Sequence, residues 1–216
     1  MLGRTIASPR EIVKVRATIF SMTPGDAIAK QLCLKCGLCC NGVIFRDVEL
    51  QPADNAARLQ SLGLPIRAPR AAAGQEKFPQ PCAALDGCRC RIYADRPTYC
   101  QQFECALFKA VRAGRVEAPT ALRLVRTTRD RAERVLRLLH ELGDTDERVS
   151  LSVRFRKVAK HFHAGAPTEE AADTFGELTL AVHDLNVLLS EKFYPGGRDI
   201  DPASVEPGIS HAHRPR

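Results

Sequence analysis

The chain of 216 residues has a formal net charge of +7, with 44% hydrophobic and 26% charged residues. This composition is ordinary for a globular protein and argues against a disordered or membrane-embedded chain. No segment approaches the roughly 18 consecutive apolar residues of a membrane span, and the N-terminus lacks the uninterrupted apolar region of a secretory signal. The sequence therefore predicts a cytoplasmic protein without membrane spans, in which thiols stay reduced.

The first third of the chain predicts short elements around a cysteine-rich loop. Residues 11–20 alternate apolar and charged side chains, which predicts a short strand. A turn at residues 23–26 is expected to start a helix, which runs through residues 27–32 into the first cysteines. The apolar residues within 43–50 are compatible with a second short strand.

A helix over residues 52–62 is predicted next, closed by Gly63. The segment 65–81 contains four prolines and predicts a loop. Another helix is expected to begin near Arg96, with Pro97 in its first turn, where a missing N–H costs least.

The rest of the chain predicts three helices with periodic apolar faces, over residues 119–142, about 147–163, and from Thr168 onward. The first of these carries six arginines on its other face. The fold expected is mainly α with a small irregular or β portion: a loop-rich cysteine-cluster metal domain plus C-terminal antiparallel helices. The expected boundaries are a cysteine-cluster metal domain at 1–112, a helical region packed on it at 113–194, and a disordered tail at 195–216.

All nine cysteines occur in two short segments. The first is Cys33-x-x-Cys36-x-x-Cys39-Cys40, and the second contains Cys82, Cys88, Cys90, Cys100 and Cys105. Tandem C-x-x-C spacing in a reducing compartment favours a metal site over disulfides or buried structural thiols. We therefore expect the two segments to converge on metal ions.

Thiolate chemistry leaves the number and kind of ions open. A tetrahedral Zn²⁺ takes four thiolates at about 2.3 Å, and four cysteines also suit an iron–sulfur cluster. The adjacent Cys39 and Cys40 point in divergent directions, so they serve two ions, or one bridges two metals, or one is a free thiol. The net charge of a four-thiolate zinc site is about −2. The cationic side chains expected to offset it are Lys35, Arg89, Arg91 and Arg96.

The cysteine spacing also resembles a known family. Cys33-x-x-Cys36-Gly37-x-Cys39-Cys40, then Cys82, then Cys90-Arg-Ile-Tyr93-Ala-Asp-Arg96-Pro97-Thr-Tyr-Cys100-Gln-Gln-Phe103 is similar to the CxxCxxCC cysteine-cluster family (YkgJ-like), which is described as chelating zinc or iron. The resemblance covers residues 33–105. It implies metal binding more firmly than it implies any reaction.

The residues together with the resemblance suggest a ligand set. The expected metal ligands are Cys33, Cys36, Cys39, Cys40, Cys82, Cys90, Cys100 and Cys105. Cys88 is an extra cysteine relative to the family signature, and its substitution by serine is expected to have little effect. Arg96 either bonds to the cluster thiolates or an anion, or starts the helix that carries Cys100 with Tyr93 packed beneath it; the second interpretation is the simpler.

Three functions remain open at this stage. The first is a metal-chelating module held together by zinc or iron, with the C-terminal helices as a possible surface for a protein partner. The second is an iron–sulfur or iron-dependent enzyme for redox or group transfer, although no glycine-rich nucleotide loop supports a methyltransferase. The third is a zinc-stabilised nucleic-acid binder that uses the basic helix 119–142. Against the third, tryptophan is absent and aromatic residues make up only 6% of the chain.

Overall fold

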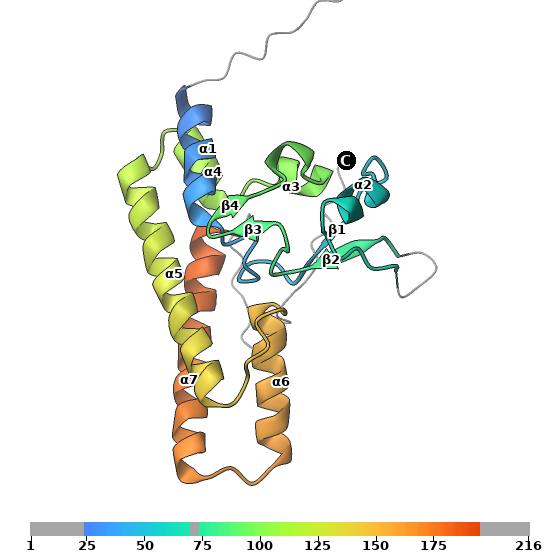
Figure 1. Cartoon of the computed structure of the whole chain (residues 1–216). Coiled ribbons are helices and arrows are strands. Elements are labelled where there is room, and N and C mark those ends of the chain that lie inside the picture. The colour runs from blue at the N-terminus through green and yellow to red at the C-terminus, as the bar shows by residue number, and fades with distance from the viewer. Residues whose placement is uncertain (1–23, 70–73, 195–216) are drawn as a thin grey trace, which may run out of the picture.

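The computed structural model describes residues 24–69 and 74–194 (Figure 1). Within this part, the chain forms seven α-helices, one short 3-10 helix and two antiparallel sheets of two strands each. The prediction of a mainly helical protein with a small β portion is confirmed. The strand predicted at residues 11–20 and the tail predicted at 195–216 lie outside the described residues.

The three helices predicted in the C-terminal half are present. They are α5 (Ala118–Glu141), α6 (Leu151–Ala164) and α7 (Glu169–Lys192). Thr168 caps α7, because its side-chain oxygen accepts a hydrogen bond from the N–H of Ala171 at 3.3 Å. α5 and α7 pack side by side along the long axis of the molecule (Figure 1). No helix in the described ranges has the length and hydropathy to cross a membrane.

Two helices at the other end differ from the prediction. α1 (Pro24–Cys36) continues through the first C-x-x-C pair, so the tight loop expected at Cys33–Cys36 is wrong. Buried Ala29 and Leu32 hold α1 in the core, and the chain turns only at the following glycine. The short helix α4 (Ala106–Arg112) was not predicted at all.

The middle of the chain is loop-rich, and its predicted boundaries needed correction. The predicted strand at 43–50 is reduced to three residues, and the segment expected to be a loop contains a strand that pairs with it through Val48 and Phe78. The helix predicted at 52–62 begins later, because the Asn55 side chain caps it by accepting the N–H of Arg58 at 2.9 Å. The elements are β1 (Asp47–Glu49), α2 (Ala56–Ser61), β2 (Lys77–Pro79), β3 (Leu85–Asp86), β4 (Arg89–Cys90), a 3-10 turn (Tyr93–Asp95) and α3 (Thr98–Gln102).

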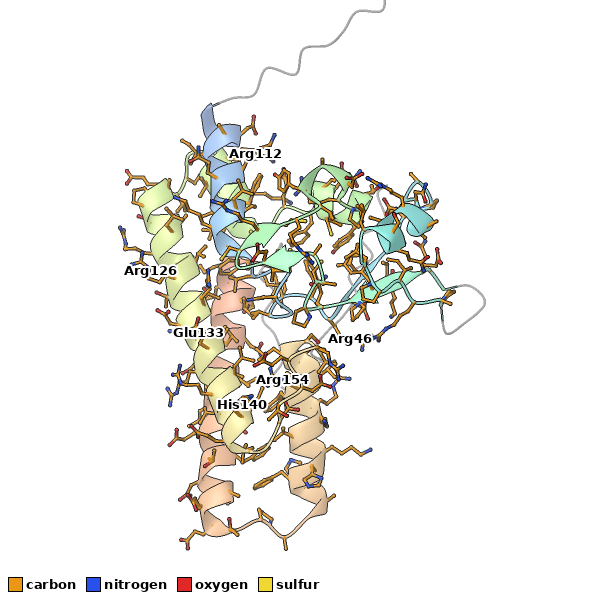
Figure 2. All side chains as sticks on the ribbon, viewed as in Figure 1. Arg46, Arg112, Arg126, Glu133, His140 and Arg154 are labelled. Carbon is orange, nitrogen blue, oxygen red and sulfur yellow. The ribbon has the colours of Figure 1, made fainter. Side chains whose placement is uncertain are left out.

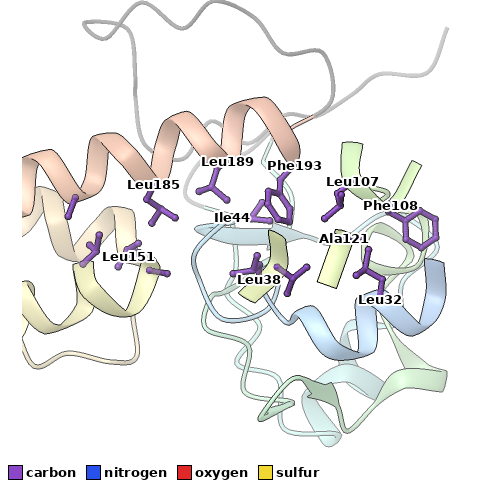
Figure 3. Close-up of a cluster of buried hydrophobic side chains, with 14 of the residues drawn as sticks. Leu32, Leu38, Ile44, Leu107, Phe108, Ala121, Leu151, Leu185, Leu189 and Phe193 are labelled. Atoms are coloured by element: carbon purple, nitrogen blue, oxygen red, sulfur yellow. The ribbon is translucent and has the colours of Figure 1, made fainter. Parts of the chain in front are cut away.

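Two hydrophobic cores hold these elements. The main core joins α1, α4 and the three C-terminal helices, so residues of both predicted domains contribute to it (Figure 3). Leu38 and Ile44, from the loop after α1, pack there with Leu185, Leu189 and Phe193 of the α7 segment. A smaller second core lies under the loop-rich part and consists of Val48, Leu50, Leu59, Leu64, Phe78, Ala84 and Ile92.

The loop after the first cysteines is fastened to the start of α6. The N–H of Leu151 donates to the carbonyl of Gly42 at 3.0 Å. A Cβ atom at Gly42 would lie 3.0 Å from the Cα of Ser150, and the φ of Gly42 is +82°. Only glycine meets both conditions without strain, so this loop is held against the helical bundle by its backbone.

A buried ion pair joins Arg154 of α6, labelled in Figure 2, to Asp144 in the loop after α5. Asp144 and Arg154 have side chains only 2% and 5% exposed, and Arg154 Nε donates to Asp144 Oδ2 at 2.6 Å. Replacing Asp144 with alanine leaves the guanidinium buried without its partner, so we expect the free energy of unfolding to fall by about 3–5 kcal/mol. Chemical denaturation measures this. The control Glu133→Ala, on the exposed face of α5, should change it by less than about 0.5 kcal/mol; equal effects would contradict the assignment.

Candidate metal centre

All nine cysteines lie among the described residues, and the two cysteine segments meet. The N–H of Cys82 donates to the carbonyl of Cys40 at 2.7 Å, which joins the segments through their backbones. Cys33 and Cys36 are three residues apart in the last turns of α1, and this spacing places them on the same face of the helix. Cys39 and Cys40 follow in a turn. Cys82 precedes β3, Cys88 and Cys90 lie in the β3–β4 hairpin, and the last two cysteines lie in α3 and at the cap of α4.

Four cysteines, here called the first group, are coupled electrostatically: Cys33, Cys36, Cys39 and Cys105, with a further effect of Cys40 on Cys33 and Cys39. Burial raises the pKa of Cys39 well above its ordinary value, and the charges on Cys36 and Cys105 raise it further. Burial also raises the pKa of Cys36 to about 11, with a contribution from Cys105. Desolvation and the charges on Cys105 and Cys36 raise the pKa of Cys33, although that residue as a whole is exposed. Such repulsion falls with distance, so these thiols lie close to one another.

The other four predicted ligands form a second group: Cys40, Cys82, Cys90 and Cys100. Burial raises the pKa of Cys40 to about 12, and the charges on Cys82 and Cys90 add most to this effect. The pKa of Cys100 is likewise raised to about 12 by burial and by the charges on Cys40, Cys82 and Cys90. The adjacent Cys39 and Cys40 therefore interact chiefly with different groups, which favours the interpretation that they serve different ions.

Packing divides six of these eight cysteines in the same way. Cys36, Cys39 and Cys105 pack against the main core. Cys82, Cys90 and Cys100 pack against the second core. Each group is thus attached to a different hydrophobic core, and the backbone bond between Cys40 and Cys82 lies where the two segments join.

Backbone N–H groups point at three of the sulfurs. The N–H of Phe108 donates to Cys105 Sγ at 3.3 Å, which also caps α4. Backbone hydrogen bonds from Leu38 lower the pKa of Cys36, which burial otherwise raises, and those from Ala84 and Leu85 do the same for Cys82. Gly37, with a φ of +69°, permits the turn that brings the N–H of Leu38 to Cys36. N–H···S bonds orient thiolates and temper their charge in metal sites.

Three arginines bring positive charge to the thiols. Arg96 lowers the pKa of Cys33, Cys40 and Cys100, against the dominant effect of burial in each case. Arg91 does so for Cys82. Both were expected from the sequence. The third, Arg129, acts on Cys36 and comes from α5, which the sequence reasoning had treated as a helix with a basic outer face.

Arg96 lies at the helix start, as the simpler interpretation predicted, and its charge acts on three of the cysteines. Its guanidinium lies 3.7 Å from the centre of the Tyr93 ring, its Nε donates to the Tyr93 carbonyl at 3.0 Å, and Pro97 caps the helix that carries Cys100. The start of that helix is also held by a side chain from an earlier segment, because Asp54 Oδ1 accepts a hydrogen bond from the N–H of Thr98 at 2.8 Å. Arg96 is therefore part of the helix start and a source of charge for the cysteines.

Cys88 lies against the first group. A Cβ atom at Gly37 would lie 3.3 Å from the Cα of Cys88 and 3.7 Å from its Sγ. The charge on Cys88 contributes to the pKa of Cys36, which burial raises most. Arg129 donates a hydrogen bond to Cys88 Sγ at 2.6 Å. Nothing in the sequence spacing indicated this contact between α5 and the β3–β4 hairpin.

The donor set suits a thiolate-bound metal, but the sulfurs of neither group surround a common point where an ion would sit. Among the described residues, no three His, Cys, Asp or Glu side chains are placed so that they could hold an ion directly. Thiols have three staggered χ1 positions, so closing a group requires side-chain rotation. The fit is in the chemistry: clustered sulfurs, backbone donors and nearby cations are what zinc or iron needs.

The arginines of α5 are largely used within the molecule. Arg131 donates to the carbonyl of Asp184 at 2.9 Å, and Arg134 is paired with Glu177 at 3.7 Å. The exposed face of α5 carries Arg126, Glu133 and His140 seven residues apart (Figure 2). This face therefore mixes both signs of charge and is not a uniformly basic patch. On α7, the side chains of Leu180 and Val187 are 68% and 42% exposed. A protein partner for the C-terminal helices stays a prediction.

Residues 32–123 match the model of the CxxCxxCC family, described as a "putative zinc- or iron-chelating domain". The match begins before Cys33 and ends after Cys105, in the first turns of α5, so it contains every cysteine of the chain. No curated protein and no solved structure matches the chain.

Proposed function

Since the CxxCxxCC domain occupies residues 32–123, we propose that this chain chelates two zinc or iron ions, one in each cysteine group. Eight cysteines at four thiolates per ion give two ions. The first site uses Cys33, Cys36, Cys39 and Cys105, and the second uses Cys40, Cys82, Cys90 and Cys100.

The division of the cysteines into two groups is the observation that carries the proposal. Thiols of one group raise one another's pKa, beyond the larger effect of burial, and the two groups pack on different cores. Two separate ions require four ligands each, whereas a single cluster would require only four of the eight cysteines. An iron–sulfur cluster in one group is the alternative that metal and sulfide analysis distinguishes.

The ions would hold the loop-rich part of the molecule in place. The second core contains only seven buried residues, and its strands are two or three residues long. Small domains of this kind commonly need a metal to fold, because the free energy of metal binding then becomes free energy of folding. We propose a cytoplasmic location, in which the thiols stay reduced and available to the ions.

Elemental analysis of the full chain, purified without oxygen, tests the proposal. We expect two transition-metal ions per chain, no strong absorption near 400 nm if they are zinc, and a lower melting temperature after treatment with a strong chelator. The matched variant Cys88→Ser should keep both ions. A wild-type protein without stoichiometric metal, equally heat-resistant with the chelator, would refute the proposal.

A further inference from the structure

Cys88 gives the first group a fifth sulfur. It lies two residues before Cys90 of the second group, yet it packs against Gly37, which follows Cys36 of the first group, and its charge acts on Cys36. The backbone of Gly37, directly after Cys36, would have a Cβ only 3.3 Å from the Cα of Cys88. Because the φ of Gly37 is positive and glycine has no side chain, the turn after α1 lies directly against Cys88.

A permanent positive charge holds this fifth sulfur. The half-buried Arg129 donates from its guanidinium to Cys88 Sγ at 2.6 Å. Guanidinium stays protonated at all physiological pH values, so Arg129 can orient the sulfur of Cys88 by its hydrogen bond and offset negative charge on a metal-bound sulfur. The neighbouring Arg126 on the same helix is exposed, so Arg129 is the arginine of this stretch that turns toward the cysteines.

The first group also has an exposed member. Cys33 is exposed, whereas Cys36, Cys39, Cys88 and Cys105 are partly buried. Cys33 therefore lies at the solvent edge of the group, although desolvation of its thiol raises the pKa of Cys33 to about 12. A ligand set with one member at its edge and a spare thiol nearby can exchange one sulfur for the other without losing its ion.

We propose that Cys88 is an alternate ligand of the first site and replaces Cys33 when Cys33 dissociates. One metal–sulfur bond breaks and one forms, so the ion keeps four thiolates and its oxidation state. The proton that Cys88 loses on binding the ion is balanced by the proton that Cys33 takes up on leaving it. Cys36, Cys39 and Cys105 are common to both ligand sets. This inference rests on the proposed two-site function.

Cobalt(II), a spectroscopic probe of tetrahedral thiolate sites, tests the exchange in the full-length protein without oxygen. We expect Cys33→Ser and Cys88→Ser each to bind two Co²⁺ ions with the absorption of four-thiolate sites. The double variant should bind one such ion fewer. If Cys33→Ser alone lost as much first-site metal as the double variant, the alternate-ligand role would be overturned, while a two-ion wild type would leave the proposed function intact.

A kinetic measurement avoids any doubt about folding of the double variant. With Cys33 present, Cys88→Ser should release the first Zn²⁺ to a chromogenic chelator about tenfold faster than wild type, because no second thiolate recaptures the ion. An unchanged release rate would contradict the proposal.

The role of Arg129 is tested in the variant that depends on Cys88. In the Cys33→Ser background, Arg129→Ala should weaken first-site Zn²⁺ binding about tenfold or more, and Arg129→Lys should restore part of it. Arg126→Ala in the same background is the matched control and should leave the affinity unchanged. Equal affinities for the Arg129→Ala and Arg126→Ala variants would remove Arg129 from the mechanism.

Discussion

Replacing Cys36 or Cys100 with serine is expected to remove one of the two bound ions, and replacing both is expected to remove both. Each cysteine belongs to a different group and packs against a different core. A site with three thiolates should bind its ion at least about 100-fold more weakly. At free metal about ten times the wild-type dissociation constant, a site weakened 100-fold is about 90% empty, and its loss lowers the free energy of unfolding by about 1.4 kcal/mol. Metal analysis and thermal unfolding measure the two effects.

The controls for these variants come from the same segments. Cys88→Ser, two residues from Cys90, should retain two ions and the wild-type melting temperature in excess zinc. If Cys36→Ser and Cys100→Ser removed the same ion, so that the double variant still bound one, the division into two groups would be wrong. If each single variant lost both ions, the eight thiols would form one cooperative site.

Zinc binding by the metal-free protein is expected to weaken steeply as the pH falls. Burial raises the pKa of Cys36 to about 11 and those of Cys40 and Cys100 to about 12, so these thiols hold their protons near neutral pH. Because the pKa of every first-group thiol is raised, chiefly by burial, an ion bound there must displace nearly four protons, and its apparent binding constant should fall by about 10⁴ for each pH unit of acidification. Competition titrations over a narrow pH range around 7 measure this slope, and calorimetry in buffers of different ionisation enthalpy counts the released protons.

The metal-free protein should show the opposite dependence at alkaline pH. A thiol whose pKa is raised by burial from 9.0 to about 12 binds more protons in the folded state than in the unfolded state between these values. Its stabilising contribution is therefore complete below about pH 9 and is lost as the pH rises toward 12. A zinc affinity independent of pH near 7, or a metal-free protein that gains stability above pH 9, would contradict the protonation states assigned to these thiols.

Periodicity determined the C-terminal half of the fold. Helices α5, α6 and α7 were predicted from apolar residues at helical spacing, and each is present within a few residues of its predicted range. The cap of α7 at Thr168 was also correct, because capping depends on residues adjacent in the chain. The same locality explains why the family of residues 32–123 was recognisable from cysteine spacing alone.

The short elements were less predictable, because the local residue pattern does not reveal what stabilises them. α4 is seven residues long, and Cys105 caps it with a thiol, which is not among the usual cap residues. β2 pairs with β1 across nearly thirty residues, so its strand character depends on a partner that local pattern does not reveal. The C-x-x-C pair remained helical because Ala29 and Leu32 are buried in the main core, where packing overrides the tendency to turn.

The sequence by itself determined that this protein is mainly helical, that its cysteines fall into two segments, and that these segments match the CxxCxxCC family model. Only the tertiary structure decided which sulfurs lie together. Adjacent Cys39 and Cys40 interact with different groups, and Arg129 reaches Cys88 from a helix that begins after the last cysteine. The physical reason is that helix periodicity is set by neighbours in the chain, whereas electrostatic repulsion between thiols and their contacts with arginine depend on distances that the packing of the two cores sets.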